Sequence, residues 1–352
     1  MNIKITGSGS YIPNKIVCNT DFGNHIFLNE DGTPIAQTND IIVQKFKGIT
    51  GIEERRYASE EQVTSQMATI AAEKAIQDSG IDPETLDYII FAHNFGDVKK
   101  GTIQGDMLPS LASKVKYNLR IKNPKCVAYD MLFGCPGWVE SVIQAQAFIR
   151  AGMAKKCLVI GAETLSRVVD PHDRDSMIYS DGAGATIIEA TNDDGGILAH
   201  ESASFTYDEA NYLFFGKSNN QDNDPDVRYI KMYGRKIYEF ALINVPQAMK
   251  DCLDKSGIEI SKLNKILIHQ ANEKMDEAIV HRFYKLYGLE MPHDIMPMTI
   301  HKLGNSSVAT VPTLFDLMVK GEIENQSLTK GDVILFASVG AGMNVNAIVY
   351  KM

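Results

Sequence analysis

The chain of 352 residues is predicted to adopt an α/β fold made of two duplicated βαβ-type halves. The first observation is a motif that recurs in register: Ser79-Gly80-Ile81 precedes an apolar strand at 86–92, and Ser256-Gly257-Ile258 precedes another from Leu263. The second is that each motif is followed by a glycine-containing loop, an apolar helix and a second buried strand. Two ordered matches of this kind indicate an internal repeat, and each half is expected to form a largely parallel sheet.

The elements of the first half follow from the spacing of apolar residues. Runs of apolar residues bounded by turn residues indicate buried strands, and apolar residues three and four positions apart indicate helices. On this basis we expect a strand at 3–12, a helix at 64–79, a strand at 86–92, a strand, turn and helix across 126–150, a strand at 156–163 and a strand after the glycine turn in 180–190.

The second half repeats this order after a polar stretch. Residues 206–227 are rich in Asn and Asp and are expected to form a surface loop. The repeat indicates that the chain divides into a first half at 1–195 and a second half at 196–352. The expected elements there are a helix at 232–255, a strand that ends at His269, an apolar helix at 308–318 and a strand at 333–338.

One helix start carries a cysteine in the setting of a nucleophile. The stretch 126–150 turns at Phe133-Gly134 and becomes helical at Pro136, a residue that suits the first helical position because its missing N–H is not needed there. Cys135 is therefore placed at or near a helix N-terminus, where partial positive charge favours the thiolate. We expect its alkylation pKa to lie below the ordinary value of about 8.5.

Other polar residues stand at equivalent corners of the repeat. His269 ends a buried strand, and Asn305 precedes an apolar helix as Cys135 does. In α/β units such positions meet at the carboxyl ends of strands, so these three residues are expected to share one crevice. Cysteine can form a thioester, and His and Asn can donate hydrogen bonds to a developing oxyanion. The turn Gly340-Ala341-Gly342 would bring backbone N–H groups close, as an oxyanion hole requires.

Composition argues against several classes of protein. The net charge of −9 argues against nucleic acid as a partner, and no apolar run is long enough to predict a membrane span. Five scattered cysteines without CxxC spacing argue against a disulfide framework and a zinc site. The start lacks the pattern of a signal peptide, and the stretch SDGAGA does not match a dinucleotide-binding fingerprint. We therefore expect a cytoplasmic protein without a metal or bound cofactor.

Several longer motifs together are specific to one family. They are ITGSGSYIPNKIVCN, TGIEERR, VDPHDRDS, SDGAGA, IHQAN, LGNSSVATVP and SVGAGMN. With these motifs the chain resembles β-ketoacyl-[acyl-carrier-protein] synthase III, a condensing enzyme of the thiolase-fold superfamily, nearly from end to end. The resemblance implies a thiolase-like, layered α-β-α-β-α architecture and a homodimer that needs no metal or cofactor.

The resemblance also implies a reaction, a decarboxylating Claisen condensation that initiates fatty-acid synthesis. Cys135 would take the acyl group from an acyl-CoA, and its N–H and that of Ala341 would hold the oxyanion. Gly340 and Gly342, on either side of Ala341, would contact the substrate. His269 and Asn305 would polarise the thioester carbonyl of malonyl-acyl-carrier protein. The carbanion left by decarboxylation would attack the acyl-cysteine and give a 3-ketoacyl-acyl-carrier protein.

Three further positions correspond to binding residues of the family. Arg174 matches an arginine that packs on the CoA adenine, and Lys274 matches a basic position that docks the acidic carrier protein. Leu108 stands where the family has a phenylalanine that the partner subunit contributes to the acyl pocket. Lys45 and Ile49 replace the tryptophan and arginine of the CoA clamp.

These departures leave alternatives to the leading hypothesis. The surround FGCPGW differs from the small residues usual in the family, and extra residues occur around 29–38 and 96–106. They suggest an altered acyl pocket, as in a related condensing enzyme of secondary lipid or polyketide synthesis with another acyl donor or acceptor. The order Cys135, His269, Asn305 also fits a papain-like cysteine protease, and the fold could serve a non-catalytic acyl-thioester binder.

Overall fold

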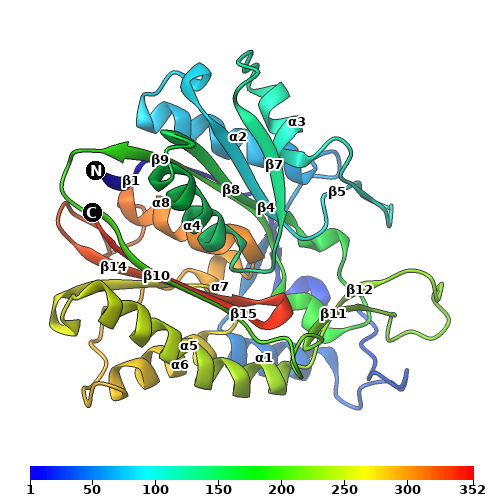
Figure 1. Cartoon of the computed structure of the whole chain (residues 1–352). Helices are drawn as coiled ribbons and strands as arrows, with labels where there is room; N and C mark the ends of the chain where they lie inside the picture. The colour runs from blue at the N-terminus through cyan, green and yellow to red at the C-terminus, as the bar shows by residue number, and fades with distance from the viewer.

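The computed structural model describes residues 1–352 and contains two main β-sheets that face each other across a pair of helices (Figure 1). The first sheet has the order β1-β9-β8-β4-β7, and its strands span Asn2–Tyr11, Asp181–Thr191, Lys156–Thr164, Tyr88–His93 and Val127–Leu132. The second has the order β10-β15-β14-β13, and its strands span Gly196–Ser204, Asn344–Lys351, Val333–Gly340 and Leu263–Ile268.

Helices cover both faces of both sheets, which gives five layers in the order α-β-α-β-α (Figure 1). The outer layer on the first sheet is α2 (Thr64–Ser79) with α3 (Leu111–Asn118). The central layer is α4 (Gly137–Arg150) with α8 (Thr310–Val319), and the outer layer on the second sheet is α5 (Gly234–Ser256) with α6 (Glu273–Lys285). Central strands such as β8 and β14 are buried on both faces, so they contain continuous apolar runs.

Smaller elements connect these layers. The short strands β2 (Lys15–Cys18) and β3 (Glu54–Tyr57) pair with each other, and helix α7 (Ile300–Leu303) packs on β3. Helix α1 (Asn39–Thr50) precedes β3 in the chain and contacts α6. Two hairpins project from the body, one made of β5 (Asp97–Val98) and β6 (Gly105–Asp106), the other of β11 (Leu213–Gly216) and β12 (Tyr229–Met232).

The two halves have the predicted duplicated organisation. Helices α2 and α5 both end at a left-handed glycine, Gly80 at φ 69° and Gly257 at φ 72°, a conformation that glycine adopts without steric cost. Strands β4 and β13 follow, and each pairs in parallel with the second buried strand of its half, β8 or β14. Strand β7 has no counterpart in the second sheet, so the first sheet is one strand wider.

The expectation of largely parallel sheets is wrong. Strand β9 runs antiparallel to both β1 and β8, and β15 runs antiparallel to both β10 and β14. Only three residues, Ala341–Met343, connect β14 to β15, and a connection that short can join only antiparallel neighbours. The predicted surface loop at 206–227 also contains a strand, β11, which pairs with β12.

The hydrophobic core is shared between the halves. One cluster of 23 buried residues lies around α4 and α8 and combines residues from both sheets, among them Ile90, Trp138, Leu267 and Phe336. The predicted boundary at 195/196 falls between β9 and β10, where the chain passes from one sheet to the other. None of the helices combines the length and the apolar character that crossing a membrane requires.

Candidate active site

A cavity of about 970 Å³ opens among the ends of the strands and helices of both halves. Cys135, His269 and Asn305 all line it, although they come from three separate segments of the chain. The repeat had led us to expect that these three residues share one crevice. Of the 37 lining residues 21 are hydrophobic. This composition suits a ligand that has an apolar chain and a few polar groups at one of its ends.

Cys135 sits on a loop that touches the loop between β14 and β15 backbone to backbone. A Cβ added to Gly340 would overlap the Cys135 nitrogen, and one added to Gly134 would lie 2.5 Å from the Ala341 nitrogen. Only glycine fits at both positions, and the contact keeps the two loops together. The Cys135 N–H donates no hydrogen bond to another protein group and is therefore available to an oxyanion.

His269 is held in place by the second sheet. It directly follows β13, and its N–H donates to the Ala337 carbonyl at 2.8 Å, which extends the pairing of β13 with β14 by one residue. The side chain is 3% exposed, and its Nδ1 is buried without a hydrogen-bond partner. Burial lowers the pKa of His269 to about 4, so the imidazole is neutral near pH 7.

Asn305 is fixed by the segment that precedes β9. Its N–H donates to Ile178 O at 3.0 Å, and its carbonyl accepts from Ser180 N–H at 2.8 Å. Gly304, at φ 60° and ψ −159°, makes the preceding bend. The Asn305 Oδ1 accepts from the Ser307 N–H at 2.8 Å, which leaves the amide NH₂ group as the donor available for a substrate oxygen.

The thiol is not activated in the way the sequence suggested. Burial raises the pKa of Cys135 to about 11, against the smaller lowering effect of a hydrogen bond from Ser307. Helix α4 begins two residues later, at Gly137, and the influence of a helix end falls off within one turn. The expected depressed pKa is therefore wrong for the ligand-free protein, because desolvation of the thiolate is the larger effect.

The remaining predicted residues divide into two groups. Arg174, Gly340 and Ala341 line the cavity, together with Lys45 and Ile49, the replacements in the CoA clamp. Gly342 makes the left-handed turn at φ 75° between β14 and β15 and does not line the cavity, so its contact with a substrate stays a prediction. Leu108 and Lys274 also lie outside the cavity of their own chain.

The sequence reasoning missed parts of the cavity wall. Phe214 and Phe215 come from β11, within the stretch 206–227 that is predicted to be a loop, and Met232 ends β12, where a helix is predicted to begin. Asn94 and Ser307 line the cavity near Cys135 and were not singled out. The cluster of large apolar residues in 212–215 was the available signal for the hairpin, but the polar stretch behind it obscured that signal. No group of three or more His, Cys, Asp or Glu side chains is arranged to hold a metal ion.

The fold and the cavity define a condensing acyltransferase of the thiolase fold. Residues 129–204 match the family described as 3-oxoacyl-[acyl-carrier-protein (ACP)] synthase III, and residues 253–352 match its C-terminal counterpart. A β-ketoacyl-[acyl-carrier-protein] synthase III of Staphylococcus haemolyticus is 32% identical over 353 residues, which cover 100% of this chain and 99% of the relative. The chain belongs to the β-ketoacyl-[acyl-carrier-protein] synthase III family.

Other relatives agree in sequence and in structure. The Erythrobacter litoralis protein of the same name is 31% identical, with 97% of each chain covered. The crystal structure of 3-oxoacyl-[acyl-carrier-protein] synthase III from Aquifex aeolicus superposes with a TM-score of 0.80 at 30% identity, covering 99% of this chain and 100% of that one. OleA of Xanthomonas campestris, at 18% identity and a TM-score of 0.77, shares the fold.

Proposed function

We propose that the enzyme catalyses the decarboxylating Claisen condensation of an acyl-CoA with malonyl-acyl-carrier protein, the step that initiates fatty-acid synthesis. The product is a 3-ketoacyl-acyl-carrier protein. The observation that carries the proposal is the presence of Cys135, His269 and Asn305 in one mostly apolar cavity, each held by the backbone around it. Membership of the condensing family argues against the two alternative functions, a papain-like protease and a separate enzyme of a secondary pathway.

In the first step the acyl group moves from CoA to the enzyme. The Cys135 sulfur attacks the thioester carbonyl, the new C–S bond forms, the bond to the CoA sulfur breaks, and the proton of the thiol leaves with CoA. The negative oxygen of the tetrahedral intermediate would lie between the N–H groups of Cys135 and Ala341. Preorganised backbone donors of this kind stabilise the transition state more than the ground state.

In the second step carbon dioxide leaves the malonyl group and its bonding electrons form an enolate. The Asn305 NH₂ group and the N–H of the neutral His269 imidazole would donate hydrogen bonds to the enolate oxygen. A neutral imidazole stabilises the negative oxygen without giving up its proton to it. The carbanion then attacks the acyl-cysteine carbonyl, a C–C bond forms, and Cys135 departs as thiolate and regains a proton.

Different residues of the cavity wall would bind the two ends of the acyl-CoA. Phe214 and Phe215 of the β11–β12 hairpin supply apolar surface for the acyl and pantetheine portions. Lys45 and Arg174 also line the cavity and carry the positive charge that CoA phosphates require. Lys45 replaces an aromatic stacking residue, so we propose that at this position charge pairing with the CoA phosphates takes the place of stacking on the adenine.

The carrier protein would approach next to this opening. Lys274 is exposed on the first turn of α6, between Asn272 and Met275, which both line the cavity. A long cationic side chain at that place suits an acidic carrier protein that must deliver its prosthetic arm into the cavity.

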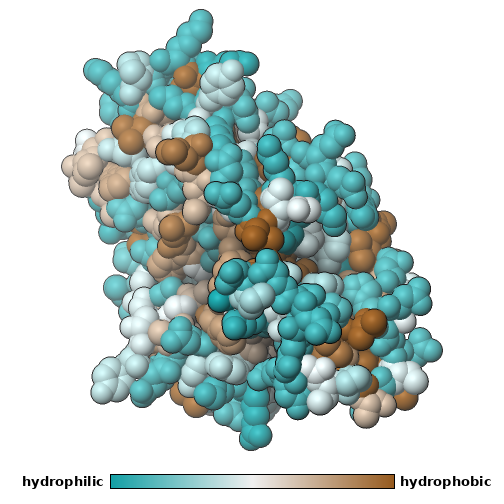
Figure 2. Space-filling model, turned by 90° about the vertical axis from the view of Figure 1, so that its right-hand side faces the viewer, coloured by the Kyte–Doolittle hydropathy of each residue, from teal (hydrophilic) through white to brown (hydrophobic).

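We propose that a second copy of the chain covers the free edge of the first sheet. Strand β7 pairs only with β4, and its Val127 and Leu132 are 47% and 65% exposed. Leu108, two residues beyond the end of the β5–β6 hairpin, is 90% exposed. The side of the molecule that carries this hairpin shows apolar side chains among hydrophilic ones (Figure 2). In a dimer joined at β7, Leu108 would reach the partner's cavity, where the family has its gating residue.

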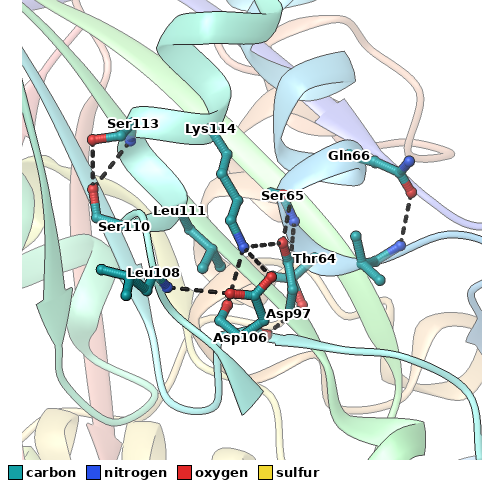
Figure 3. Close-up of polar contacts among 12 residues, drawn as sticks. Thr64, Ser65, Gln66, Asp97, Asp106, Leu108, Ser110, Leu111, Ser113 and Lys114 are labelled. Atoms are coloured by element: carbon teal, nitrogen blue, oxygen red, sulfur yellow. Dashed lines mark hydrogen bonds and ion pairs between the residues drawn. The ribbon is translucent and has the colours of Figure 1, made fainter. Parts of the chain in front are cut away.

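The hairpin is anchored well enough to act as a rigid arm. Lys114 of α3 reaches between its two carboxylates, at 3.0 Å from Asp97 and 2.9 Å from Asp106 (Figure 3). Asp97 also accepts from the N–H and the hydroxyl of Ser65, at 2.7 and 2.8 Å. The Leu108 N–H in turn donates to Asp106 at 3.2 Å. The base of the arm is therefore fixed to both α2 and α3.

The proposed reaction is tested with malonyl-acyl-carrier protein labelled in the carbons that remain after decarboxylation. Incubation with a panel of acyl-CoA donors should give labelled 3-ketoacyl-acyl-carrier protein with the wild type and none with Cys135→Ala. Condensation that continues in Cys135→Ala would refute the proposal. Product formation only with donors other than acyl-CoA would refute the assignment of the donor.

A further inference from the structure

A hydrogen-bond network leads to the reacting sulfur of Cys135. The proposed mechanism does not yet use this network. The Ser307 hydroxyl donates to the Cys135 Sγ at 3.4 Å. The same hydroxyl oxygen accepts from the Asn94 Nδ2 at 3.3 Å. Asn94 donates its backbone N–H and its Nδ2 to the Glu163 Oε1, at 2.5 and 2.6 Å. The network thus connects the buried carboxylate of Glu163 with the nucleophile Cys135.

The donor and acceptor groups of these residues fix the direction of each hydrogen bond in the network. An ionised Glu163 can only accept hydrogen bonds, so Asn94 must turn its NH₂ group, and not its carbonyl, toward the carboxylate and Ser307. Since the Ser307 oxygen accepts from Asn94, its single proton is free to point at Cys135. A hydrogen bond donated to sulfur stabilises the thiolate more than the thiol.

The backbone at Ser307 supports the same conclusion. Its φ of 53° lies in the left-handed region that residues other than glycine disfavour. Strained residues of this kind persist where surrounding contacts require them, and they cluster at functional sites. Here the strained residue donates its N–H to the Asn305 Oδ1 at 2.8 Å and its hydroxyl to Cys135. One residue therefore orients both the carboxamide and the nucleophile.

We propose that Ser307 is a further catalytic residue, which stabilises the Cys135 thiolate, and that Asn94 and Glu163 are positioning residues acting through it. The proposal rests on the proposed role of Cys135 as acyl acceptor. Cys135 is a thiolate twice in the cycle, when it attacks the acyl-CoA and when it departs from the new C–C bond. The Ser307 hydrogen bond would therefore act in both half-reactions, whereas in the acyl-enzyme the sulfur is a weak acceptor and the hydroxyl is released.

Glu163 also changes the pKa of Cys135 directly, in the direction opposite to the effect of Ser307. Its side chain is fully buried, its second oxygen Oε2 has no hydrogen-bond partner, and its negative charge raises the pKa of Cys135. A glutamine in its place would accept the same two hydrogen bonds from Asn94 through its amide oxygen, without that charge. The substitution Glu163→Gln therefore separates the positioning effect of this side chain from its charge.

The test is the rate of alkylation of Cys135 by iodoacetamide in the full chain as a function of pH, followed on the Cys135 peptide by mass spectrometry. Ser307→Ala and Ser307→Gly should both react roughly ten-fold more slowly near pH 8, because the loss of a hydrogen bond to a charged group raises the alkylation pKa by about one unit. Glu163→Gln should react faster than the wild type. Ser306→Ala is the matched control, since the Ser306 hydroxyl pairs with Thr310 and does not line the cavity.

The two Ser307 variants distinguish the hydroxyl from the backbone. Glycine removes the strain at this position, so a slow rate in Ser307→Ala that recovers in Ser307→Gly would assign the effect to the backbone and overturn the proposal. Rates in both variants within about two-fold of the wild type would overturn it as well, since that is far less than the loss expected for a hydrogen bond to a charged group. Alkylation needs no acyl-CoA, so a wild type that fails to accept an acyl group would refute the proposed function and leave this result interpretable.

Discussion

At the level of single residues, the cavity favours the neutral form of the His269 imidazole, because burial lowers the pKa of this side chain to about 4. We predict that His269→Ala lowers the condensation rate by roughly 10²–10³-fold, the usual cost of removing one oxyanion donor, while acyl transfer to Cys135 continues. Asn305→Ala should behave in the same way. Separate assays of acyl-enzyme formation and condensation check this, and an equal loss in both half-reactions would contradict the division of roles.

A second residue-scale prediction concerns pH and stability. Burial raises the pKa of Glu163 to about 7, above its ordinary value of 4.5. Between these two pH values the unfolded chain releases a proton that the folded protein retains, so this group makes the protein less stable as pH rises through the window. Glu163→Gln should remove that loss and raise the free energy of unfolding near pH 8 by roughly 1–3 kcal/mol. Denaturant titrations at about pH 5 and pH 8 measure it, and an equal change at both would contradict the account.

The same residues show which parts of the site a sequence can reveal. Cys135, His269 and Asn305 could be predicted because each stands at the end of a repeated element. Ser307 lies 172 positions from Cys135 and carries no periodic signal, so its contact with the thiol needed the folded structure. The pKa of Cys135 was predicted in the wrong direction because a sequence reveals the nearby helix end but not the extent of burial.

At the level of elements, the contact between two glycine loops positions the oxyanion donors. We predict that Gly340→Ala lowers condensation at least about 100-fold, since the new Cβ would overlap the Cys135 nitrogen and must push the loops apart. Gly48→Ala in α1 is the control, because a Cβ there meets nothing within 4 Å. That variant should keep its activity and gain about 0.5–1 kcal/mol of stability. Full activity in Gly340→Ala would show that the contact is not required.

The predicted elements were mostly correct, and the errors have a common physical origin. The helices α2 and α5 and the strands β4 and β13 follow from periodicity, which is a local property of the sequence. The direction of β9 and β15, by contrast, depends on which neighbour each strand pairs with, and local periodicity does not encode that. The β11 strand was missed because its partner β12 lies beyond a long polar segment.

At the level of the whole molecule, the open edge of β7 and the exposed arm lead to a prediction about assembly. We predict a dimer in solution and its loss in Leu132→Asp, because the side chain is 65% exposed on the open edge strand and the proposed interface would bury a charge there. Light scattering after size-exclusion chromatography measures the mass. Leu289→Asp, at an exposed leucine outside this sheet, is the control and should remain dimeric. A monomeric wild type would contradict the assembly.

The arm predicts a further effect that only an assembly can show. Leu108→Trp should shorten the longest acyl-CoA accepted while the dimer persists, because the enlarged side chain would narrow the partner's cavity rather than its own. Competition among acyl-CoA donors of increasing chain length measures the preference. An unchanged donor preference in a dimeric variant would remove Leu108 from the acyl pocket.

The whole account depends on Cys135 as the acceptor of an acyl group, and one measurement tests it directly. The intact enzyme is exposed to a mixture of acyl-CoA thioesters without malonyl-acyl-carrier protein, and its mass is recorded before and after digestion. We predict that one acyl group is added to each chain, located on the Cys135 peptide, removed by hydroxylamine and absent in Cys135→Ala. No added mass with any acyl-CoA, or an acyl group on a different residue, would contradict the account.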